Sequence, residues 1–327
     1  MLCENILKAI GHTPLIRLNG LNSGPATIFV KLEGSNPGGS AKDRSALAMV
    51  EAAERQGILK PGNRIIESTS GNLGVALAMI GAVKGYRVTC VVDPKITDAN
   101  QSMIEAFGGE IVMVDEVDDT GGYLKSRLKR VQRLLKSEPN SFWPNQYANR
   151  ANPAAHFWTT GREILRDTQN KVDYLVVGTG TCGSIVGTGK AIKQKIPTAQ
   201  IIAVDVEGSA IFGGSKHPRL VTGIGSSITP PILDRDLIDQ IFIVTDREAF
   251  TTARLLARRE GIFAGGSSGA VTAVALRLSQ QATPGTVIVT LLPDRGERYL
   301  DTIYSDAWMN KHIFSKERCN ELEAQFT

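Results

Sequence analysis

The chain has 327 residues, of which 42% are hydrophobic and 21% are charged, and its formal net charge is +4. This length allows about two domains with a large buried core. The weak positive charge gives no reason to expect a nucleic-acid or membrane-surface partner. The longest apolar stretch, VALAMIGAV at 75–83, is too short to span a bilayer, and the N-terminus shows no signal-peptide pattern. We therefore expect a cytoplasmic protein.

Cysteine and histidine are few and widely separated. The chain has no CxxC pair, and neither residue type shows the spacing of metal ligands. We therefore expect free thiols and no bound metal. The residues concerned are Cys3, Cys90, Cys182, Cys319, His12, His156, His217 and His312.

Helical and strand-like segments alternate from residue 44 onward. In chain order we expect a helix at 44–57, a strand at 64–68, a helix at 71–85, a strand at 86–92, a helix at 97–109, a strand at 110–114 and a basic helix at 125–136. A strand at 173–177, a helix from 183, strands at 201–206 and 241–244, helices at 246–261 and 268–280, and a strand at 286–292 follow. The apolar residues of the basic helix recur at helical spacing, so we interpret its charges as a solvated face.

This alternation indicates parallel sheets flanked by helices. The strands form two sets, at about 60–115 and 174–292, which predicts two α/β domains. In such folds ligands bind at the carboxyl ends of the strands. We therefore expect a ligand between the two domains.

Four loops rich in glycine and small residues lie at the predicted element boundaries. They are NPGGSAKDR (36–44), STSGNLG (68–74), GTGTCGS (178–184) and AGGSSGA (264–270). Each opens a helix, and the backbone N–H groups at a helix N-terminus can bind an anion. The first loop carries Lys42 directly after bare residues, as if the backbone had to approach a ligand.

The third loop has the spacing Gly178-x-Gly180-x-x-Gly183 of the dinucleotide fingerprint, with Asp205 about 20 residues later. An NAD-dependent dehydrogenase is therefore one possibility, but the same turn suits a single phosphate, or no ligand at all. The second loop offers hydroxyls and the Asn72 amide, which could hold a carboxylate or simply cap the helix.

The four loops together with one lysine form a more specific pattern. A lysine in a partly desolvated site can form a Schiff base with an aldehyde. A phosphate-binding turn and a hydroxyl facing a pyridine nitrogen complete the requirements of pyridoxal 5'-phosphate. A dehydrogenase would leave the first and fourth loops unexplained. On this interpretation the loop before Lys42 is bare because the cofactor ring lies against it.

These loops, with GHTPLIRL (11–18) and LLPDRGERYL (291–300), resemble the signatures of the cysteine synthase/cystathionine β-synthase family of fold type II pyridoxal-phosphate enzymes. The resemblance covers nearly the whole chain. It implies an α/β fold of two domains, each with a mostly parallel twisted sheet flanked by helices. It places a large cofactor-binding domain at 1–42 and 148–327 and a smaller mobile substrate domain at 43–147. It also implies a homodimer.

The resemblance also implies roles for individual residues. Lys42 would bind the cofactor covalently and act as the base, Asn72 would bond the ring oxygen, and Ser267 would face the pyridine nitrogen. The residues expected to cradle the phosphate are Gly180, Thr181, Cys182, Gly183 and Ser184. Those expected to bind the substrate α-carboxylate are Ser68, Thr69 and Ser70.

Several stretches, among them CVVDPKI, NQYAN and GIGSS, more specifically resemble the N-(2-amino-2-carboxyethyl)-L-glutamate synthases. The substrates of those enzymes are O-phospho-L-serine and L-glutamate, and their product is a 2,3-diaminopropionate precursor for siderophore biosynthesis. Leu73 stands where cysteine synthases usually have a second threonine, which supports the narrower resemblance. The alternative is a cysteine synthase that uses O-acetylserine or O-phosphoserine with sulfide.

A glutamate nucleophile requires a pocket for two carboxylates. Candidate residues are Arg127 and Tyr147, with Ser226 and Ser227 as weaker ones, and Gly223 is also expected to bind substrate. Arg127 could instead be a surface residue of the basic helix, and Tyr147 a core aromatic residue. We expect His156 to be structural, since Lys42 already supplies a base.

Overall fold

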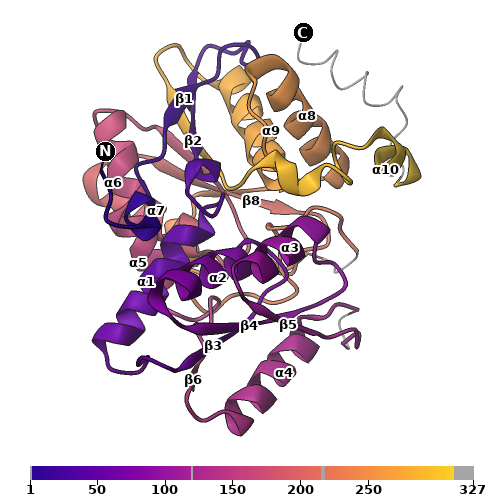
Figure 1. Cartoon of the computed structure of the whole chain (residues 1–327). Coiled ribbons are helices and arrows are strands. Elements are labelled where there is room, and N and C mark those ends of the chain that lie inside the picture. Colours follow the sequence, from indigo (N-terminus) through magenta and orange to yellow (C-terminus); the bar gives the residue numbers. More distant parts are fainter. Residues whose placement is uncertain (1, 119–120, 215–217, 313–327) are drawn as a thin grey trace.

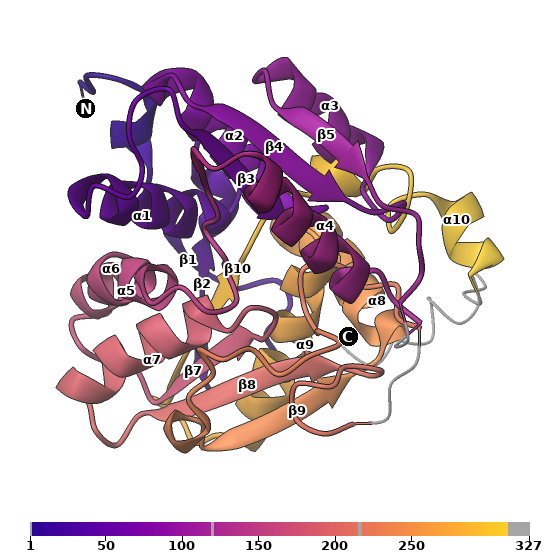
Figure 2. The same cartoon turned by 90° about the horizontal axis from the view of Figure 1, so that it is seen from below.

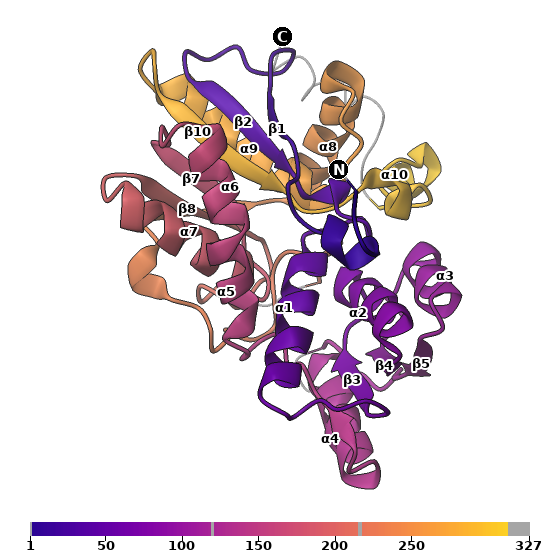
Figure 3. The ribbon, with the colours of Figure 1, turned by 60° about the vertical axis from the view of Figure 1, so that its left-hand side comes forward.

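The computed structural model describes residues 2–118, 121–214 and 218–312, and contains two separate β-sheets (Figure 1). The larger sheet has the strand order β1-β2-β10-β7-β8-β9, and the smaller one has the order β5-β4-β3-β6. Figure 3 shows the larger sheet in the upper part of the molecule and the smaller one below it, each between helices. The predicted fold class, with two mostly parallel sheets flanked by helices, is therefore confirmed.

The larger sheet is parallel except at one edge. Its strands are β1 (Leu15–Arg17), β2 (Thr27–Leu32), β7 (Tyr174–Gly178), β8 (Gln200–Val206), β9 (Gln240–Val244) and β10 (Val287–Leu292). Only β1 runs antiparallel to its neighbour, β2. Strands β2 and β10 pair in register from Thr27 with Val287 to Leu32 with Leu292, so an early and a late segment of the chain lie side by side in one sheet.

Alternate side chains of each strand face different helices, which buries both faces of the larger sheet. Ile288 and Leu292 of β10 pack with α8 (Asp246–Glu260) and α9 (Gly266–Gln281). Val289 and Leu291, between them, pack with α6 (Thr160–Asp167) and α7 (Gly183–Lys195).

The smaller sheet has the same layered arrangement. Its strands β3 (Arg64–Ser68), β4 (Arg87–Val92), β5 (Glu110–Met113) and β6 (Ser141–Phe142) are all parallel. One face packs against α1 (Lys42–Arg55), α2 (Asn72–Lys84) and α3 (Asp98–Ala106). The other face packs against α4 (Leu124–Ser137), the predicted basic helix (Figure 2). Helix α4 buries Val131 on the sheet, while Arg130 and Arg133 are exposed.

Every predicted helix and strand is present, with ends that differ by a few residues. Helix α1 begins at Lys42, two residues earlier than predicted, because the Ser40 hydroxyl accepts a hydrogen bond from the Lys42 N–H (3.2 Å). The sequence analysis missed β1, β2, β6, α5 (Ala151–Trp158), α6 and α10 (Asp306–Lys311). It also missed the short 3-10 helices η1 (Ile6–Ala9), η2 (Glu33–Ser35), η3 (Arg235–Leu237) and η4 (Gly296–Tyr299). The domain boundaries at 42 and 147, and the mobility of the smaller domain, stay predictions.

A network of buried charges joins β2, η2, α1 and α6. Arg44 forms ion pairs with Glu33 (2.7 Å) and Glu163 (2.6 Å). Lys31, which is fully buried, pairs with Glu163 (2.8 Å). Burial alone would raise the pKa of Glu163, but the hydrogen bonds and charges of Arg44 and Lys31 hold it well below its usual range. The network therefore fixes the start of α1 against the larger sheet.

Replacing Glu163 by alanine should destabilise the protein strongly, because Lys31 and Arg44 would lose a shared counter-charge inside the protein. We expect Glu163→Ala to lower the free energy of unfolding by about 3–5 kcal/mol. The matched control is Glu51→Ala, which breaks a solvent-exposed pair with Arg55 and should cost less than about 1 kcal/mol. Urea denaturation measures both, and equal losses in the two variants would contradict the role of the network.

Candidate active site

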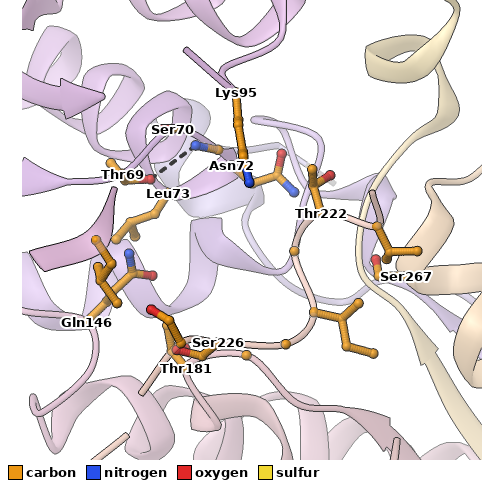
Figure 4. Close-up of a pocket in the computed structure, with 18 of the residues that line it drawn as sticks. Thr69, Ser70, Asn72, Leu73, Lys95, Gln146, Thr181, Thr222, Ser226 and Ser267 are labelled. Carbon is orange, nitrogen blue, oxygen red and sulfur yellow. Dashed lines mark hydrogen bonds between the residues drawn. The ribbon is translucent and has the colours of Figure 1, made fainter. Parts of the chain in front are cut away.

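A cavity of about 430 Å³ lies between the two sheets, in the place that the sequence predicts. Loops that follow the carboxyl ends of β3, β4, β7, β8 and β10 line it. Figure 4 shows Thr69, Ser70, Asn72 and Lys95 on one wall, with Thr181 and Ser226 opposite. Parallel strands of two sheets thus direct their carboxyl ends at one site.

Lys42 lines this cavity from the first position of α1. The structure gives its amine no hydrogen bond or ion pair with any residue that it describes. Burial lowers the pKa of Lys42, and the nearby carboxylate of Asp294 opposes that shift. A lowered pKa increases the neutral fraction of an amine, which is the form that acts as a base or a nucleophile.

The glycines before Lys42 serve a different purpose from the expected one. Gly38 and Gly39 are not among the residues that line the cavity; Ser40 and Ala41 are. A Cβ on Gly38 would lie 2.6 Å from a carboxylate oxygen of Asp43, and one on Gly39 would lie 2.8 Å from the Arg298 guanidinium. Gly39 also has a φ of +82°. The loop is bare because its own neighbours approach it closely.

The segment after β10 holds Asn72 in place. The Asn72 amide donates a hydrogen bond to Asp294 (2.7 Å), and its carbonyl oxygen accepts one from Arg298. Arg298 also donates to the carbonyl of Gly38, and the Tyr299 hydroxyl donates to Asp294 (2.6 Å). Since a side-chain amide has two N–H donors, one donor of Asn72 remains for a ligand.

The turn between β7 and α7 offers an unused set of backbone donors. Gly180 and Thr181 line the cavity, and Cys182 takes a left-handed conformation with φ of 66° directly before α7. The backbone N–H groups of residues 180–184 have no hydrogen-bond acceptor among the described residues. The cavity lining does not include Cys182, Gly183 or Ser184. These three residues would therefore contact a ligand only through their backbone N–H groups at the helix N-terminus.

Ser267 lies at the start of α9 and lines the cavity on the side of Thr222 (Figure 4). It is buried among the residues of the fourth loop, which begins α9 as predicted. Its hydroxyl is a neutral group that can both donate and accept a hydrogen bond.

A cluster of hydrogen-bonded and ion-paired side chains lies on the cavity wall that the smaller sheet contributes. It consists of Ser70, Asp93 and Arg127. The Ser70 hydroxyl accepts hydrogen bonds from the Asp93 N–H (2.8 Å) and from Arg127 (3.2 Å). Arg127 also forms an ion pair with Asp93 (3.1 Å), and only 12% of its side chain is exposed. The alternative that Arg127 is an ordinary surface residue is therefore wrong.

The other predicted substrate-binding residues also line the cavity. The lining residues include Ser68, Thr69, Leu73, Tyr147, Gly223, Ser226 and Ser227. Burial raises the pKa of Tyr147, against the opposing charge of Arg127. Ser226 is fixed from behind, because its N–H donates to the hydroxyl of Ser209 (3.2 Å).

Several polar residues of the cavity were not predicted from the sequence: Ser40, Asp93, Lys95, Tyr123, Gln146, Arg219, Thr222 and Asp294. Several of them lie in stretches quoted above: Ser40 in NPGGSAKDR, Asp93 and Lys95 in CVVDPKI, Gln146 in NQYAN and Asp294 in LLPDRGERYL. The position of Lys95 directly after β4 could have indicated a place at the ligand edge of the sheet. Arg219 belongs to no motif, and no sequence signal marks it.

Behind the cavity wall, a buried carboxylate supports the segment of Gln146. Glu67 accepts hydrogen bonds from Trp143 Nε1 (3.0 Å) and from the N–H groups of Ser68 (2.8 Å) and Gln146 (3.2 Å). Burial nevertheless raises the pKa of Glu67 to about 7. The wall therefore contains a group that changes its charge close to neutral pH.

Other predicted features lie away from the cavity. His156 is buried and contacts the Thr160 hydroxyl (3.0 Å), and burial lowers its pKa to about 3, in keeping with the structural role expected for it. Asp205 is 1% exposed and accepts a hydrogen bond from the Val206 N–H, so it does not offer its carboxylate to a ribose as a dinucleotide site requires.

Among the described residues, Cys3, Cys90 and Cys182 are free thiols, and no cluster of three potential metal ligands occurs. Cys319 and His217 lie outside the described residues. Within the same ranges, every helix is too short or too polar to cross a membrane.

Comparisons with known proteins agree with this geometry. Residues 6–294 match the protein family described as pyridoxal-phosphate dependent enzyme. A hydrogen sulfide-producing enzyme from Fusobacterium nucleatum is 40% identical, with a TM-score of 0.88 over 91% of this chain and 100% of that one. O-ureido-L-serine synthase is 37% identical, with a TM-score of 0.88 over 95% of this chain and 100% of that one. A cysteine synthase from Entamoeba histolytica is 37% identical, with a TM-score of 0.88 over 93% of this chain and 91% of that one.

The raised pKa of Glu67 should make stability depend on pH. The pKa rises from an ordinary value of 4.5 to about 7 on folding, so between these values the folded protein binds more protons than the unfolded one. The contribution of Glu67 to stability therefore falls as the pH rises through this range. Glu67→Gln stays neutral at every pH. We therefore expect the difference in free energy of unfolding between Glu67→Gln and the unaltered protein to shift in favour of the variant by about 1–3 kcal/mol from about pH 5 to about pH 8.

The measurement is the free energy of unfolding in urea at the two pH values. Glu116→Gln, at an exposed position, is the control, and its difference from the unaltered protein should stay constant. A difference for Glu67→Gln that is equal at both pH values would show that Glu67 is already ionised in the folded protein.

Proposed function

Because the chain belongs to the pyridoxal-phosphate dependent enzymes of the cysteine synthase family, which carry out β-replacement, we propose that it joins O-phospho-L-serine and L-glutamate. The products are N-(2-amino-2-carboxyethyl)-L-glutamate, a 2,3-diaminopropionate precursor for siderophore biosynthesis, and phosphate. A C–N bond forms at the β-carbon, the C–O bond to phosphate breaks, and the amine of glutamate loses a proton.

The residues of the cavity fit pyridoxal 5'-phosphate. Lys42 presents an amine without a partner among the described residues, and residues 180–184 present backbone N–H groups without an acceptor. These groups would hold the aldehyde carbon and the phosphate, respectively. Ser267 would face the pyridine nitrogen, and the free N–H of Asn72 would bond the ring oxygen.

When bound, the cofactor supplies an electron sink that makes the Cα proton of the amino-acid substrate acidic. Lys42 is the residue that takes this proton and returns it after replacement. Burial lowers the pKa of Lys42, which supports this assignment because a lower pKa increases the fraction of the amine that is neutral and can accept a proton. Ser267, as a neutral partner, leaves the ring nitrogen without a full counter-charge.

The donor substrate, O-phospho-L-serine, carries an α-carboxylate and a phosphate. We assign the carboxylate to Thr69 and Ser70 at the start of α2, where hydroxyls and helix N–H groups converge. We assign the phosphate to Arg219, whose planar guanidinium matches phosphate geometry. Arg219 lines the same cavity as these residues.

The observation that carries the choice of substrates is the charge of the cavity. Besides Lys42, its described lining residues include the cations Lys95, Arg127 and Arg219 against the carboxylates Asp93 and Asp294. A small nucleophile such as sulfide needs no such set of cations, whereas a phosphorylated donor and a dicarboxylate acceptor do. Arg127, Tyr147, Gly223 and Ser226 are the residues that we assign to glutamate.

A second candidate is a cysteine synthase that uses O-acetylserine or O-phosphoserine with sulfide. The likeness to a cysteine synthase and to a hydrogen sulfide-producing enzyme favours it. It shares every cofactor contact with the first candidate, so only the substrates distinguish the two.

The family resemblance further implies a homodimer and a smaller domain at 43–147 that closes over the substrate. We retain both as part of the proposal. Light scattering of the purified protein tests the dimer, and X-ray scattering with and without O-phospho-L-serine tests the closure.

Purified enzyme loaded with pyridoxal phosphate should release phosphate from O-phospho-L-serine and, with L-glutamate, form the N-linked product. The measurement combines a phosphate assay with mass spectrometry of the products, using O-acetyl-L-serine and sulfide in parallel reactions. Product formation with sulfide only would assign the chain to the cysteine synthases instead.

Lys42→Ala should lower the rate of phosphate release by about a thousandfold or more, since it removes both the base and the nucleophilic amine. Lys60→Ala, at an exposed position, should leave the rate unchanged. Circular dichroism confirms that both variants fold. A Lys42→Ala enzyme that keeps more than about a tenth of the rate would exclude Lys42 as the base.

A further inference from the structure

Lys95 is a cavity-lining cation that the family resemblance did not assign. It lies in the loop between β4 and α3 and lines the cavity on the wall of Thr69 and Asn72 (Figure 4). The structure shows no ion pair for its ammonium with any residue that it describes. A charge in such a place is available to a ligand, because binding need not first break an internal pair.

The loop of Lys95 is held by the same carboxylate that holds Arg127. One oxygen of Asp93 accepts a hydrogen bond from the Lys95 N–H (2.9 Å), and the other pairs with Arg127 Nε (3.1 Å). Asp93 is buried, and its hydrogen bond to Lys95 and its ion pair with Arg127 fix the backbone of one cation relative to the guanidinium of the other. Asp93 is therefore a positioning residue for both.

The two cations differ in how much charge they offer. Asp93 largely balances the charge of Arg127, and one N–H of Arg127 donates to the Ser70 hydroxyl. For Lys95, in contrast, Asp93 accepts a hydrogen bond only from the backbone N–H. Arg127 is thus suited to orient a carboxylate by the geometry of its remaining donors. Lys95 is suited to attract a second, more distant carboxylate by charge alone.

Building on the function proposed above, we propose that Lys95 binds the side-chain carboxylate of the acceptor amino acid. It thereby determines that the acceptor is a dicarboxylate such as L-glutamate and not a neutral amino acid of the same shape. Arg127 then contacts the α-carboxylate of the acceptor, and Asp93 keeps the two cations at a fixed separation.

The test uses the holoenzyme with O-phospho-L-serine at saturation and either L-glutamate or L-glutamine, which has the same shape without the distal charge, as the acceptor. We expect the unaltered enzyme to prefer L-glutamate. Lys95→Met should raise the KM for L-glutamate about tenfold or more, the effect of losing one charge-assisted hydrogen bond, and leave the KM for L-glutamine nearly unchanged. Lys95→Arg should retain the preference.

Two further measurements separate this role from others. The rapid release of phosphate on mixing with O-phospho-L-serine should keep its concentration dependence in Lys95→Met, because the donor does not contact Lys95. Calorimetric titration of L-glutamate into the holoenzyme should show the same loss of affinity as the KM. Lys171→Met, at an exposed position on the larger sheet's side, is the control and should change none of these values.

An unchanged preference for L-glutamate in Lys95→Met would overturn the proposal while leaving the proposed reaction intact. Weaker binding of O-phospho-L-serine alone would also overturn it, since Lys95 would then serve the donor phosphate. If the unaltered enzyme accepts sulfide but neither amino acid, the proposed reaction itself fails, and the role of Lys95 fails with it.

Discussion

The buried charges of Lys31, Glu33, Arg44 and Glu163 determine where Lys42 lies. Arg44 is two residues after Lys42 on the same helix, and its guanidinium reaches carboxylates on η2 and α6. Removing such charges from water is costly, and only the dense set of hydrogen bonds compensates for it. The start of α1 is consequently held in one position against the larger sheet, although most of that helix packs on the smaller one. The position of the Lys42 amine in the cavity depends on that anchor.

The alternation of apolar segments was sufficient to predict the parallel sheets, because strands buried on both faces are nearly continuous apolar runs. It was not sufficient for β1, β2 and β6, which are short or pair with strands far away in the chain. β2 pairs with β10, more than 250 residues later, and no local pattern reports such a partner. Helices α5 and α6 were missed because each has only eight residues, about two turns, in which helical spacing is hard to recognise.

For the site, motifs predicted many of the residues that line the cavity, but long-range contacts decide how each side chain is held. The sequence placed Arg127 on a basic helix, and only the fold shows that its side chain turns inward to Asp93 and Ser70. In the same way, the glycines before Lys42 were explained by a ligand, whereas Asp43 and Arg298 are what approach them. Residues such as Lys95 and Arg219 reach the cavity through loop paths that no sequence spacing encodes.

The turn at 178–184 contains no charged side chain, so it offers an anion only backbone N–H groups and hydroxyls. The opposite wall presents the full charges of Lys95 and Arg127, to which we assign the carboxylates of the acceptor. Dissolved ions screen the attraction between full charges near solvent much more than short hydrogen bonds inside a protein. On the proposed function, the affinity of the cavity for its cofactor should therefore depend little on ionic strength, whereas its affinity for substrates should depend on it strongly. Substitutions can then change one of these two affinities without changing the other.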